Sequence, residues 1–329
     1  MADAMGGAGA PEVTIVIVSY NTSDLLERCL EAAFASAPGV SREVPVIDNA
    51  SSDGSAEWVA GRWPDVLLTV NRANRGYVPA CNQGLQAARG RFVLALNSDA
   101  FLRGEALGVL TRHLKAHAEA RAVGQRLLNA DGSTQWVCAR RAPRFLPSLL
   151  AHTHLPAWFP GLLPFARGAY PPAWHESAGE VEVLSGACTL FRREALDRAG
   201  LLDERLVLDY DDAEWSLRAR GRGLRLHYRS KAEVMHLGGM SRDFDAELSS
   251  LANLSSIGTF WDLAFVPSAA AVLKLALLVS IGLSLLKNAL LGPFAARRRA
   301  RAAPLVRMLK HGLAMLLRPA AARPGRSPA

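Results

Sequence analysis

The first hundred residues alternate between strand-like and helix-like segments, and this alternation restricts the fold more than any other feature of the sequence. Short runs rich in Val, Ile and Leu predict buried strands. These runs lie at 13–19, 43–47, 67–71 and 92–97. Cap residues and helical periodicity predict helices between them, at about 22–35 and 79–88. Strands that alternate with helices build a parallel or mixed sheet covered by helices, so the sequence predicts a doubly wound α/β fold.

Polar residues follow three of these strands at the point where each one ends. Tyr20 and Asn21 follow the first strand, the turn-rich segment 48–55 follows the second, and Ser98 and Asp99 follow the last. In an open parallel sheet, ligands bind outside the carboxyl ends of the strands, beside the N-termini of the helices. We therefore expect these polar clusters to lie together in one binding site.

The middle of the chain gives weaker signals. Residues 122–137 predict a hairpin that turns at Asp131 and Gly132. Residues 143–174 contain seven of the eighteen prolines and predict a long apolar loop. Regular signals then return, with a strand at 180–191, a helix at 211–220 and strand-like segments at 224–229 and 231–237.

Positive charge is concentrated near the C-terminal end of the chain. The net charge is +8, but residues 263–329 hold eleven Lys and Arg and no acidic residue, so the preceding part carries −3. A strongly basic tail indicates an acidic partner, and its apolar character favours anionic lipid over nucleic acid. Four single cysteines without a CxxC pair argue against a zinc site and favour a reducing, cytosolic compartment.

The tail contains two apolar segments that would meet a membrane differently. Residues 275–286 are apolar between Lys274 and Lys287, and these twelve residues would span about 18 Å as a helix, less than the roughly 30 Å hydrocarbon core. A longer span would bury Lys274, at about 2.5–3.5 kcal/mol. Residues 305–318 place basic side chains on one helical face and Leu and Met on the other, which is typical of an interfacial helix. We expect a monotopic protein on the cytoplasmic face of the membrane; a helix packed on the protein body and a spanning helix are the alternatives.

Two polar clusters at the predicted sheet edge have a chemical interpretation. The first combines Tyr20 and Asn21 with Asp48 and Asn49. Its amides and carboxylate can pair with a nucleobase edge and with ribose hydroxyls. The second cluster, residues 97–99, places a carboxylate at a strand end, where it can hold a divalent cation beside a diphosphate. Asp and Asn also cap helices and form turns, which is the structural alternative for both clusters.

Two further features lie late in the chain. Asp209, Asp211, Asp212 and Glu214 crowd four acids into six residues. Crowded carboxylates raise one another's pKa, so one of them is a candidate general base, although acids also stabilise the first turn of a helix through its dipole. His236, at a strand end before two glycines, is either a ligand or a buried structural side chain.

Seven motifs occur in a fixed order along the chain. They are VSYN (18–21), VIDNASSDGS (46–55), NRANRGYVPACNQGL (71–85), ARGRFVLALNSDA (88–100), LSGACTLFRREAL (184–196), DYDDAEWSLRARG (209–221) and EVMHLGGMS (233–241). Together they closely resemble family 2 glycosyltransferases, and most of all the bacterial rhamnosyltransferase-like branch that builds cell-surface glycans. The resemblance runs from about 13 to 241, nearly three quarters of the chain.

The resemblance implies a GT-A fold and inverting transfer of a sugar from a nucleotide-activated donor. It implies a catalytic domain at 11–242, and the charge and apolar patterns described above predict a helical, membrane-associated tail at 243–329. Residues matched by motif fall into two binding sets. The nucleoside would be held by Tyr20, Asn21, Asp48 and Asn49, and the sugar-nucleotide cleft would be lined by Arg75, Gly76 and Asn82.

The resemblance also implies a metal site and a general base. Residues Asn97, Ser98 and Asp99 occupy the position of the family's DxD motif, so Asp99 becomes the main carboxylate for Mg²⁺ or Mn²⁺. His236 matches a late histidine that can complete this site. The family's acidic pair corresponds to Asp211 and Asp212, and Asp212 is the expected base.

The implied donor is dTDP-rhamnose or a UDP-sugar, and the implied acceptor is a glycan, expected to be linked to a polyprenyl diphosphate; no nucleic acid partner is expected. Two other classes of protein stay open. A nucleotidyltransferase would need a glycine- and lysine-rich phosphate loop after its first strand, where this chain has VSYNTSDLL. An inactive sugar-nucleotide sensor or membrane scaffold would bind the donor without turnover, although the acidic cluster is intact.

Overall fold

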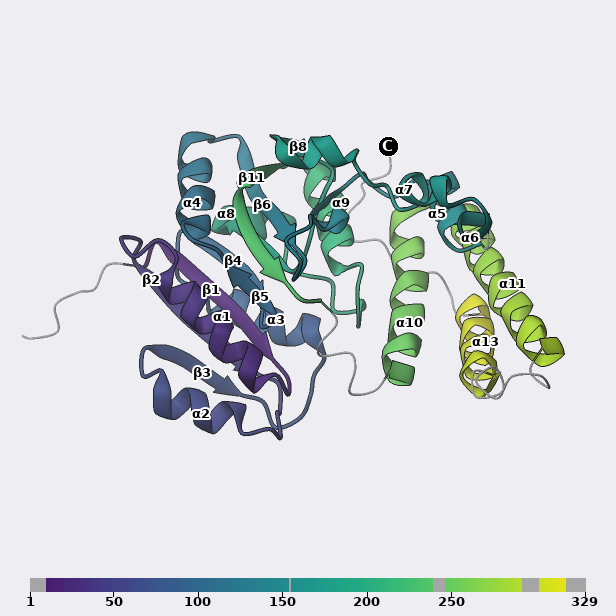
Figure 1. The fold of residues 1–329 in the computed structure, drawn as a ribbon, viewed down its shortest axis with the longest axis horizontal. Coiled ribbons are helices and arrows are strands. Elements are labelled where there is room, and N and C mark those ends of the chain that lie inside the picture. The colour runs from purple at the N-terminus through teal and green to yellow at the C-terminus, as the bar shows by residue number, and fades with distance from the viewer. Residues whose placement is uncertain (1–9, 154, 239–245, 292–301, 318–329) are drawn as a thin grey trace, which may run out of the picture. The chain divides into compact units, whose positions relative to one another are not determined.

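The computed structural model describes residues 10–153, 155–238, 246–291 and 302–317 (Figure 1). The described residues form two compact units. The first comprises residues up to 140 together with 171–202 and 215–238, and the second comprises 141–170, 203–214 and the residues from 246 onward.

The first unit is built on a nine-stranded mixed sheet flanked by helices (Figure 1). Its strands are β1 (Val13–Ser19), β2 (Arg42–Asp48), β3 (Val66–Val70), β4 (Phe92–Asn97), β5 (Ala100–Leu102), β6 (Ala120–Leu128), β8 (Ala178–Val181), β10 (Cys188–Arg192) and β11 (Arg225–His236). The strand order is β3-β2-β1-β4-β10-β6-β11-β5, and β8 also pairs with β11. The first four strands are mutually parallel, whereas β10 is antiparallel to both β4 and β6. A separate small sheet pairs β7 (Ala139–Arg140) with β9 (Val183–Leu184).

Local sequence accounts for the elements of this unit. Strand β1 is rich in Val and Ile and is buried along its whole length, as expected for a central strand between parallel neighbours. The helices are α1 (Ser23–Ala35), α2 (Ser55–Arg62), α3 (Tyr77–Ala87), α4 (Ala106–Ala116) and α8 (Arg193–Ala199), with the short 3₁₀ segments η1 (Trp136–Cys138) and η3 (Pro172–Glu176). Helix α9 (Asp211–Gly221) starts in the second unit and ends in the first. The predicted strands and helices of the first hundred residues are confirmed to within a few residues, and so is the α/β class.

The structure corrects two expectations for the middle of the chain. The hairpin is shorter than predicted: after β6 the chain turns at Gly132, with φ +83°, and the return arm is held by an antiparallel bridge of Leu128 with Thr134 and by the Gln135 backbone N–H, which donates to the Leu127 carbonyl at 2.8 Å, but it forms no strand of its own. The predicted loop at 143–174 contains helices α5 (Phe145–Ala151), α6 (Leu155–Trp158) and α7 (Leu163–Ala166), with a 3₁₀ turn η2 (Pro160–Leu162). Prolines in this segment stand in first helical turns, where no backbone N–H is required, so they start short helices instead of preventing them.

The second unit also contains three longer helices, α10 (Ala246–Ala264), α11 (Pro267–Leu291) and α13 (Ala302–Leu317). Helix α13 packs against both others where glycines allow close approach. Met315 lies against Gly258, and Leu278 lies against Gly312. The predicted amphipathic segment at 305–318 lies in α13 and is helical as far as Leu317, and residue 318 lies outside the described part.

Helix α11 is longer than the twelve-residue apolar segment that the sequence indicated. Its residues Pro267–Asn288 are long and apolar enough to cross a membrane, judged by length and composition alone. The helix continues through Lys274, whose ammonium lies 2.7 Å from both carboxylate oxygens of Asp262 on α10, with both side chains nearly fully buried. The apolar segment was predicted to end at Lys274 because an unpaired lysine is costly to bury. Pairing with Asp262 compensates the charge, so Lys274 does not end the segment.

Candidate active site

The parallel strands bring the first polar clusters to one edge of the sheet. In the register of the sheet, Ser19 is paired with Asp48 and Val18 with Asn97, so β1, β2 and β4 end side by side. Asn21, at φ +51°, accepts a hydrogen bond from the Ser52 backbone N–H through its Oδ1, at 2.7 Å. The predicted clustering of these residues within the first unit is confirmed.

Asp48 is the buried carboxylate of this edge. The residue as a whole is only 1% exposed. Oδ1 accepts a hydrogen bond from the Ser51 backbone N–H at 3.0 Å, whereas the buried Oδ2 has no hydrogen-bond partner among the described residues. Buried carboxylate oxygens are normally satisfied, so this oxygen is a candidate acceptor for a donor that water or a ligand supplies.

Asn49, by contrast, is fully engaged by the loop before α3. Its Nδ2 donates to Asn74 Oδ1 at 2.8 Å and to the Gly76 carbonyl at 3.2 Å. Its Oδ1 accepts from the Arg75 backbone N–H and from Asn71 Nδ2, both at 3.1 Å. These bonds hold the loop, in which Gly76 takes a φ of +84° that other residues rarely adopt.

The other two residues predicted along the cleft differ in their surroundings. Asn82, in the buried face of α3, donates from Nδ2 to the Leu202 carbonyl at 3.0 Å and accepts the Leu202 backbone N–H at Oδ1, at 3.1 Å. Both ends of its amide therefore fasten α3 to the segment that follows α8. Arg75 is exposed at the edge of the sheet. Tyr20 is half-buried after β1.

The residues at the DxD position lie at the end of β4, of which Asn97 is the last residue. Asn97 Oδ1 is buried without a hydrogen-bond partner among the described residues. Ser98 Oγ accepts from Thr22 Oγ1 at 3.1 Å, and the Thr22 hydroxyl also lies 3.1 Å from Ser19 Oγ. This buried hydroxyl chain fixes the turn from which Asp99 emerges, 7% exposed.

His236 reaches Asp99 through the pairing of β5 with β11. Ala100, which follows Asp99, is paired with His236 in this antiparallel register, and the Leu237 backbone N–H donates to the Asp99 carbonyl at 3.1 Å. As a result, His236 Nε2 lies 3.5 Å from Asp99 Oδ1. Sequence motifs separated by more than a hundred residues therefore meet at one point.

Gln135 is a site residue that the sequence analysis missed. Its Nε2 donates to the His236 carbonyl at 2.6 Å, and its Oε1 lies 3.0 Å from His236 Nδ1. Because a carbonyl can only accept, the amide orientation is fixed, and Oε1 must accept a proton from Nδ1. In the neutral form of the ring, Nε2 is then the nitrogen without a proton, and it faces Asp99. No local pattern around Gln135 could have indicated this role.

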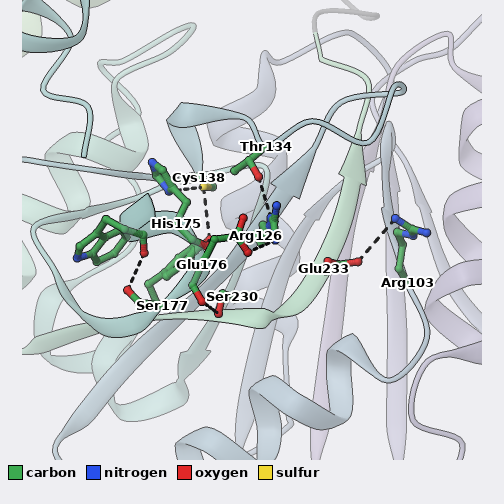
Figure 2. A network of polar contacts seen from close by, with 11 residues as sticks. Arg103, Arg126, Thr134, Cys138, His175, Glu176, Ser177, Ser230 and Glu233 are labelled. Atoms are coloured by element: carbon green, nitrogen blue, oxygen red, sulfur yellow. Dashed lines mark hydrogen bonds and ion pairs between the residues drawn. The ribbon is translucent and has the colours of Figure 1, made fainter. Parts of the chain in front are cut away.

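Figure 2 shows the polar network that supports the segment containing Gln135. From β6, Arg126 donates through Nε to Thr134 Oγ1 at 2.7 Å and through Nη1 to Glu176 Oε2 at 2.6 Å. At the end of η1, Cys138 Sγ lies 3.3 Å from His175 Nδ1; both residues are buried, and burial raises the pKa of this thiol. The network is thus structural, with a protonated cysteine.

In the same view, Arg103 and Glu233 join the segment after β5 to β11 (Figure 2). Their side chains form an ion pair at 3.6 Å, and the Arg103 backbone N–H donates to the Glu233 carbonyl at 3.0 Å. Since Asp99 precedes β5 and His236 ends β11, this tie supports the register that places the two candidate ligands together.

Asp99 and His236 fit a divalent cation as two of its ligands. Oxygen and nitrogen ligands lie about 2.0–2.2 Å from Mg²⁺ or a similar ion, so two atoms 3.5 Å apart can share one. Among the described residues there is no group of three or more His, Cys, Asp or Glu side chains arranged to hold a metal. An ion here would take its remaining ligands from donor phosphates and water, as Mg²⁺ commonly does.

The predicted acids lie in the second unit, at the start of α9. Asp211 and Glu214 are buried, and Asp212 is half-buried, with its Oδ1 accepting the Ala213 backbone N–H at 2.6 Å. The Glu214 backbone N–H donates to the Tyr210 carbonyl at 2.8 Å, which begins the helical hydrogen bonding. Asp211 and Asp212 thus occupy the first turn of a helix, where a carboxylate is stabilised by the dipole.

Comparison with known proteins supports the expected relationship. The family described as "Glycosyl transferase family 2" matches residues 14–200. Over 239 residues the chain is 28% identical to an N-acetylglucosaminyl-diphospho-decaprenol L-rhamnosyltransferase of Mycobacterium tuberculosis, covering 68% of this chain and 75% of that protein. Over 98 residues it is 41% identical to the succinoglycan biosynthesis protein ExoO of Rhizobium meliloti, but this match spans only 30% of this chain and 28% of ExoO. The resemblance to the rhamnosyltransferase-like branch is confirmed.

Solved structures with a similar fold are also known. One is the mannosyltransferase PcManGT from Pyrobaculum calidifontis, in complex with GDP-Man and Mn²⁺, with a TM-score of 0.53 and 19% identity over 94% of this chain and 88% of that one. Another is GalNAc-T7 with UDP, GalNAc and Mn²⁺, with a TM-score of 0.55 and 16% identity over 78% and 50% of the two chains. At this level of identity the likeness concerns the fold, and it confirms the predicted GT-A architecture.

Proposed function

The chain belongs to glycosyl transferase family 2, and from this membership we propose that it transfers a sugar, with inversion, from a nucleotide-activated donor to a glycan acceptor in the assembly of a cell-surface polysaccharide. The names of its relatives support this role, since one is a rhamnosyltransferase and another a succinoglycan biosynthesis protein. The predicted catalytic domain, 11–242, contains the whole region that matches the family.

The juxtaposition of Asp99 and His236 carries the proposal. A carboxylate oxygen and a ring nitrogen 3.5 Å apart form a ligand pair suited to Mg²⁺ or Mn²⁺. On the same sheet edge, Asp48 presents an oxygen with no partner in the described part of the chain, and this oxygen suits an N–H group of a nucleobase. A nucleoside diphosphate would satisfy both features at once, with its base at Asp48 and its phosphates at the metal. Tyr20, Asn21 and Arg75 would complete this donor site.

The mechanism follows from the charge that develops on the donor. A bound cation compensates the negative charge of the diphosphate and so makes it a better leaving group. Asp99 and His236 would hold this cation beside the diphosphate. Asp212 would accept the proton of the acceptor hydroxyl as its oxygen attacks the anomeric carbon, on the face opposite the departing diphosphate. A positioned general base of this kind accelerates such a step by about 10²–10⁴-fold.

The proposed donor is dTDP-rhamnose, with a UDP-sugar as the alternative, and the proposed acceptor is a glycan linked to a polyprenyl diphosphate. The Mycobacterium relative, named for an N-acetylglucosaminyl-diphospho-decaprenol acceptor, supports a lipid-linked substrate. The apolar side chains of the α5–α7 region suit the same acceptor. Trp158 and Phe159 are among the most exposed large apolar residues described, at 72% and 58%.

A membrane location, on the cytoplasmic face, fits the second unit and the proposed tail at 243–329. Large apolar side chains about half exposed form a stripe along α11, at Val272, Leu275, Val279, Leu283 and Leu286. Their spacing of three and four residues places them on one helical face. Together with the basic tail, this stripe suits a bilayer with anionic lipids, which attract each nearby Lys or Arg by about 1 kcal/mol.

A turnover assay tests the proposal. Purified protein should release nucleoside diphosphate from dTDP-rhamnose or a UDP-sugar when Mn²⁺ or Mg²⁺ and a glycan acceptor are present. EDTA should stop the reaction, and Asp99→Ala should abolish its recovery on metal addition, whereas Asp65→Ala, an exposed acid before β3, should behave like the wild type. Full activity in EDTA would contradict the metal assignment. Donor binding without release of nucleotide would favour a sensor over an enzyme.

A further inference from the structure

The turn before α9 has an unusual backbone. Asp209 and Tyr210 both take a φ of +65°, in the left-handed region that side chains other than glycine rarely adopt. Two consecutive residues in this conformation, one of them a bulky tyrosine, persist only where surrounding contacts hold them. Because the Tyr210 carbonyl accepts the Glu214 backbone N–H, the conformation of this turn sets the start of α9.

Helix α10 supplies contacts to three successive residues of this turn. Ser256 Oγ accepts the Leu208 backbone N–H at 2.9 Å. Asn253 Nδ2 donates to Asp209 Oδ2 at 2.5 Å. The third contact is a stacked pair of rings, Phe260 on Tyr210, with centroids 5.0 Å apart and planes inclined by 26°.

The residues of α10 that make these contacts share one face of the helix. Positions 253, 256 and 260 are separated by three and four residues, so their side chains lie above one another. Positions 255, 258 and 262 lie on the opposite face and contact the other tail helices. Ser255 Oγ is 2.6 Å from His311 Nε2 of α13, and Asp262 pairs with Lys274 of α11.

We propose that α10 is a positioning element for catalysis, which holds the 208–210 turn in its left-handed conformation and thereby orients Asp212 at the start of α9. This inference rests on the proposed function, in which Asp212 is the general base. Asn253, Ser256 and Phe260 are its positioning residues. The first helix of the tail then has a role in the chemistry besides any role in membrane attachment, and α11 and α13 support it from behind.

Hydrogen–deuterium exchange of the full chain tests the contact without any substrate. Ser256→Ala should accelerate exchange of the amides in 210–216 by about tenfold or more, since the first turn of α9 would open more often. Ser255→Ala is the matched control, because the neighbouring serine contacts α13 instead of the turn. Equal exchange of 210–216 in the two variants, with equal melting temperatures, would overturn the proposal.

Turnover measurements then separate positioning from general stability. With dTDP-rhamnose or UDP-sugar as the assayed donor, Asn253→Ala and Phe260→Leu should lower kcat about tenfold and leave KM for the donor within about twofold. Phe260→Tyr should restore kcat because it keeps the stacked ring, and Asn253→Ala should cause no further loss in an Asp212→Asn background. A loss that persists in that background would overturn the proposal.

The proposed function fails in a different way. If Asp212→Asn alone keeps full turnover, the base assignment is wrong, whatever the exchange experiment shows. If Asp212→Asn is inactive and the α10 variants are as active as Ser255→Ala, the base assignment stands and the positioning role of α10 is refuted.

Discussion

Replacing Gln135 with leucine should weaken metal binding without removing a metal ligand. In the wild type, Gln135 Oε1 accepts the Nδ1 proton of His236 at 3.0 Å and Gln135 Nε2 donates to the His236 carbonyl at 2.6 Å. Leucine fills a similar volume but makes neither bond, so the His236 ring loses both its fixed tautomer and its fixed orientation. Substitution of such outer partners lowers metal affinity by about 10–100-fold, which corresponds to about 1.4–2.7 kcal/mol.

The measurement is a titration with Mn²⁺ followed by electron paramagnetic resonance, in the presence of dTDP or UDP to supply phosphate oxygens. We expect the Kd for Mn²⁺ of Gln135→Leu to rise 10–100-fold, and that of His236→Ala to rise at least as much. Gln86→Leu, at an exposed position of α3, is the control and should bind as the wild type does.

Two results would refute this reasoning in different ways. A Kd for Gln135→Leu within twofold of the wild type, together with a weakened His236→Ala, would show that the tautomer needs no partner at Nδ1. Unchanged affinity in both variants would show that His236 is not a metal ligand, and Asp99 would then act with phosphate and water alone.

The remaining predictions concern the base, the tail and the response to acid. Asp212→Asn should lower turnover at least about 10²-fold and leave donor affinity within a few-fold, whereas an inactive Asp211→Asn beside an active Asp212→Asn would identify the other acid as the base. Lys274→Met should destabilise the protein by about 3–5 kcal/mol, because it leaves the Asp262 carboxylate buried without its ammonium partner. The double variant, Lys274→Met combined with Asp262→Leu, should recover most of this loss when thermal melting is measured. Burial, and secondarily the neighbouring histidines, lowers the pKa of His113 to about 4, so the unfolded chain binds an extra proton below about pH 6.5 and stability should fall as the pH drops from there toward 4. His113→Gln should flatten this part of the melting-temperature profile, and an unchanged slope would assign the acid sensitivity to other groups.

Much of the first hundred residues could be predicted because the signals there are local. The runs at 13–19 and 92–97 are strands β1 and β4 with the same bounds, since a buried parallel strand shows itself as an uninterrupted apolar run. The polar residues at the ends of the runs at 43–47 and 92–97 predicted one edge of the sheet for Asp48 and Asn97, because parallel strands end on the same side. The family motifs then predicted the roles of these residues, which the experiments above test.

The roles of side-chain amides could not be predicted, because residue type does not reveal which partner a group finds. Asn49 and Asn82 are both expected at the donor site, and the structure adds that their amides hold the 71–76 loop and the Leu202 backbone. Asp48 looks no different in the sequence, but one of its oxygens stays unpartnered among the described residues. Only the hydrogen-bond network separates a group that supports a site from one that can bind a ligand.

The sequence by itself determined the α/β class, the order of the elements and the edge at which polar residues gather, because each follows from the spacing of neighbouring side chains. Tertiary structure decided which distant residues meet. His236 faces Asp99 because β5 and β11 pair at the end of the sheet, and Gln135 orients His236 because the turn after β6 returns beside it. Lys274 is buried because Asp262 of a neighbouring helix neutralises it. Strand order and helix packing depend on burial over the whole chain, and no local pattern records them.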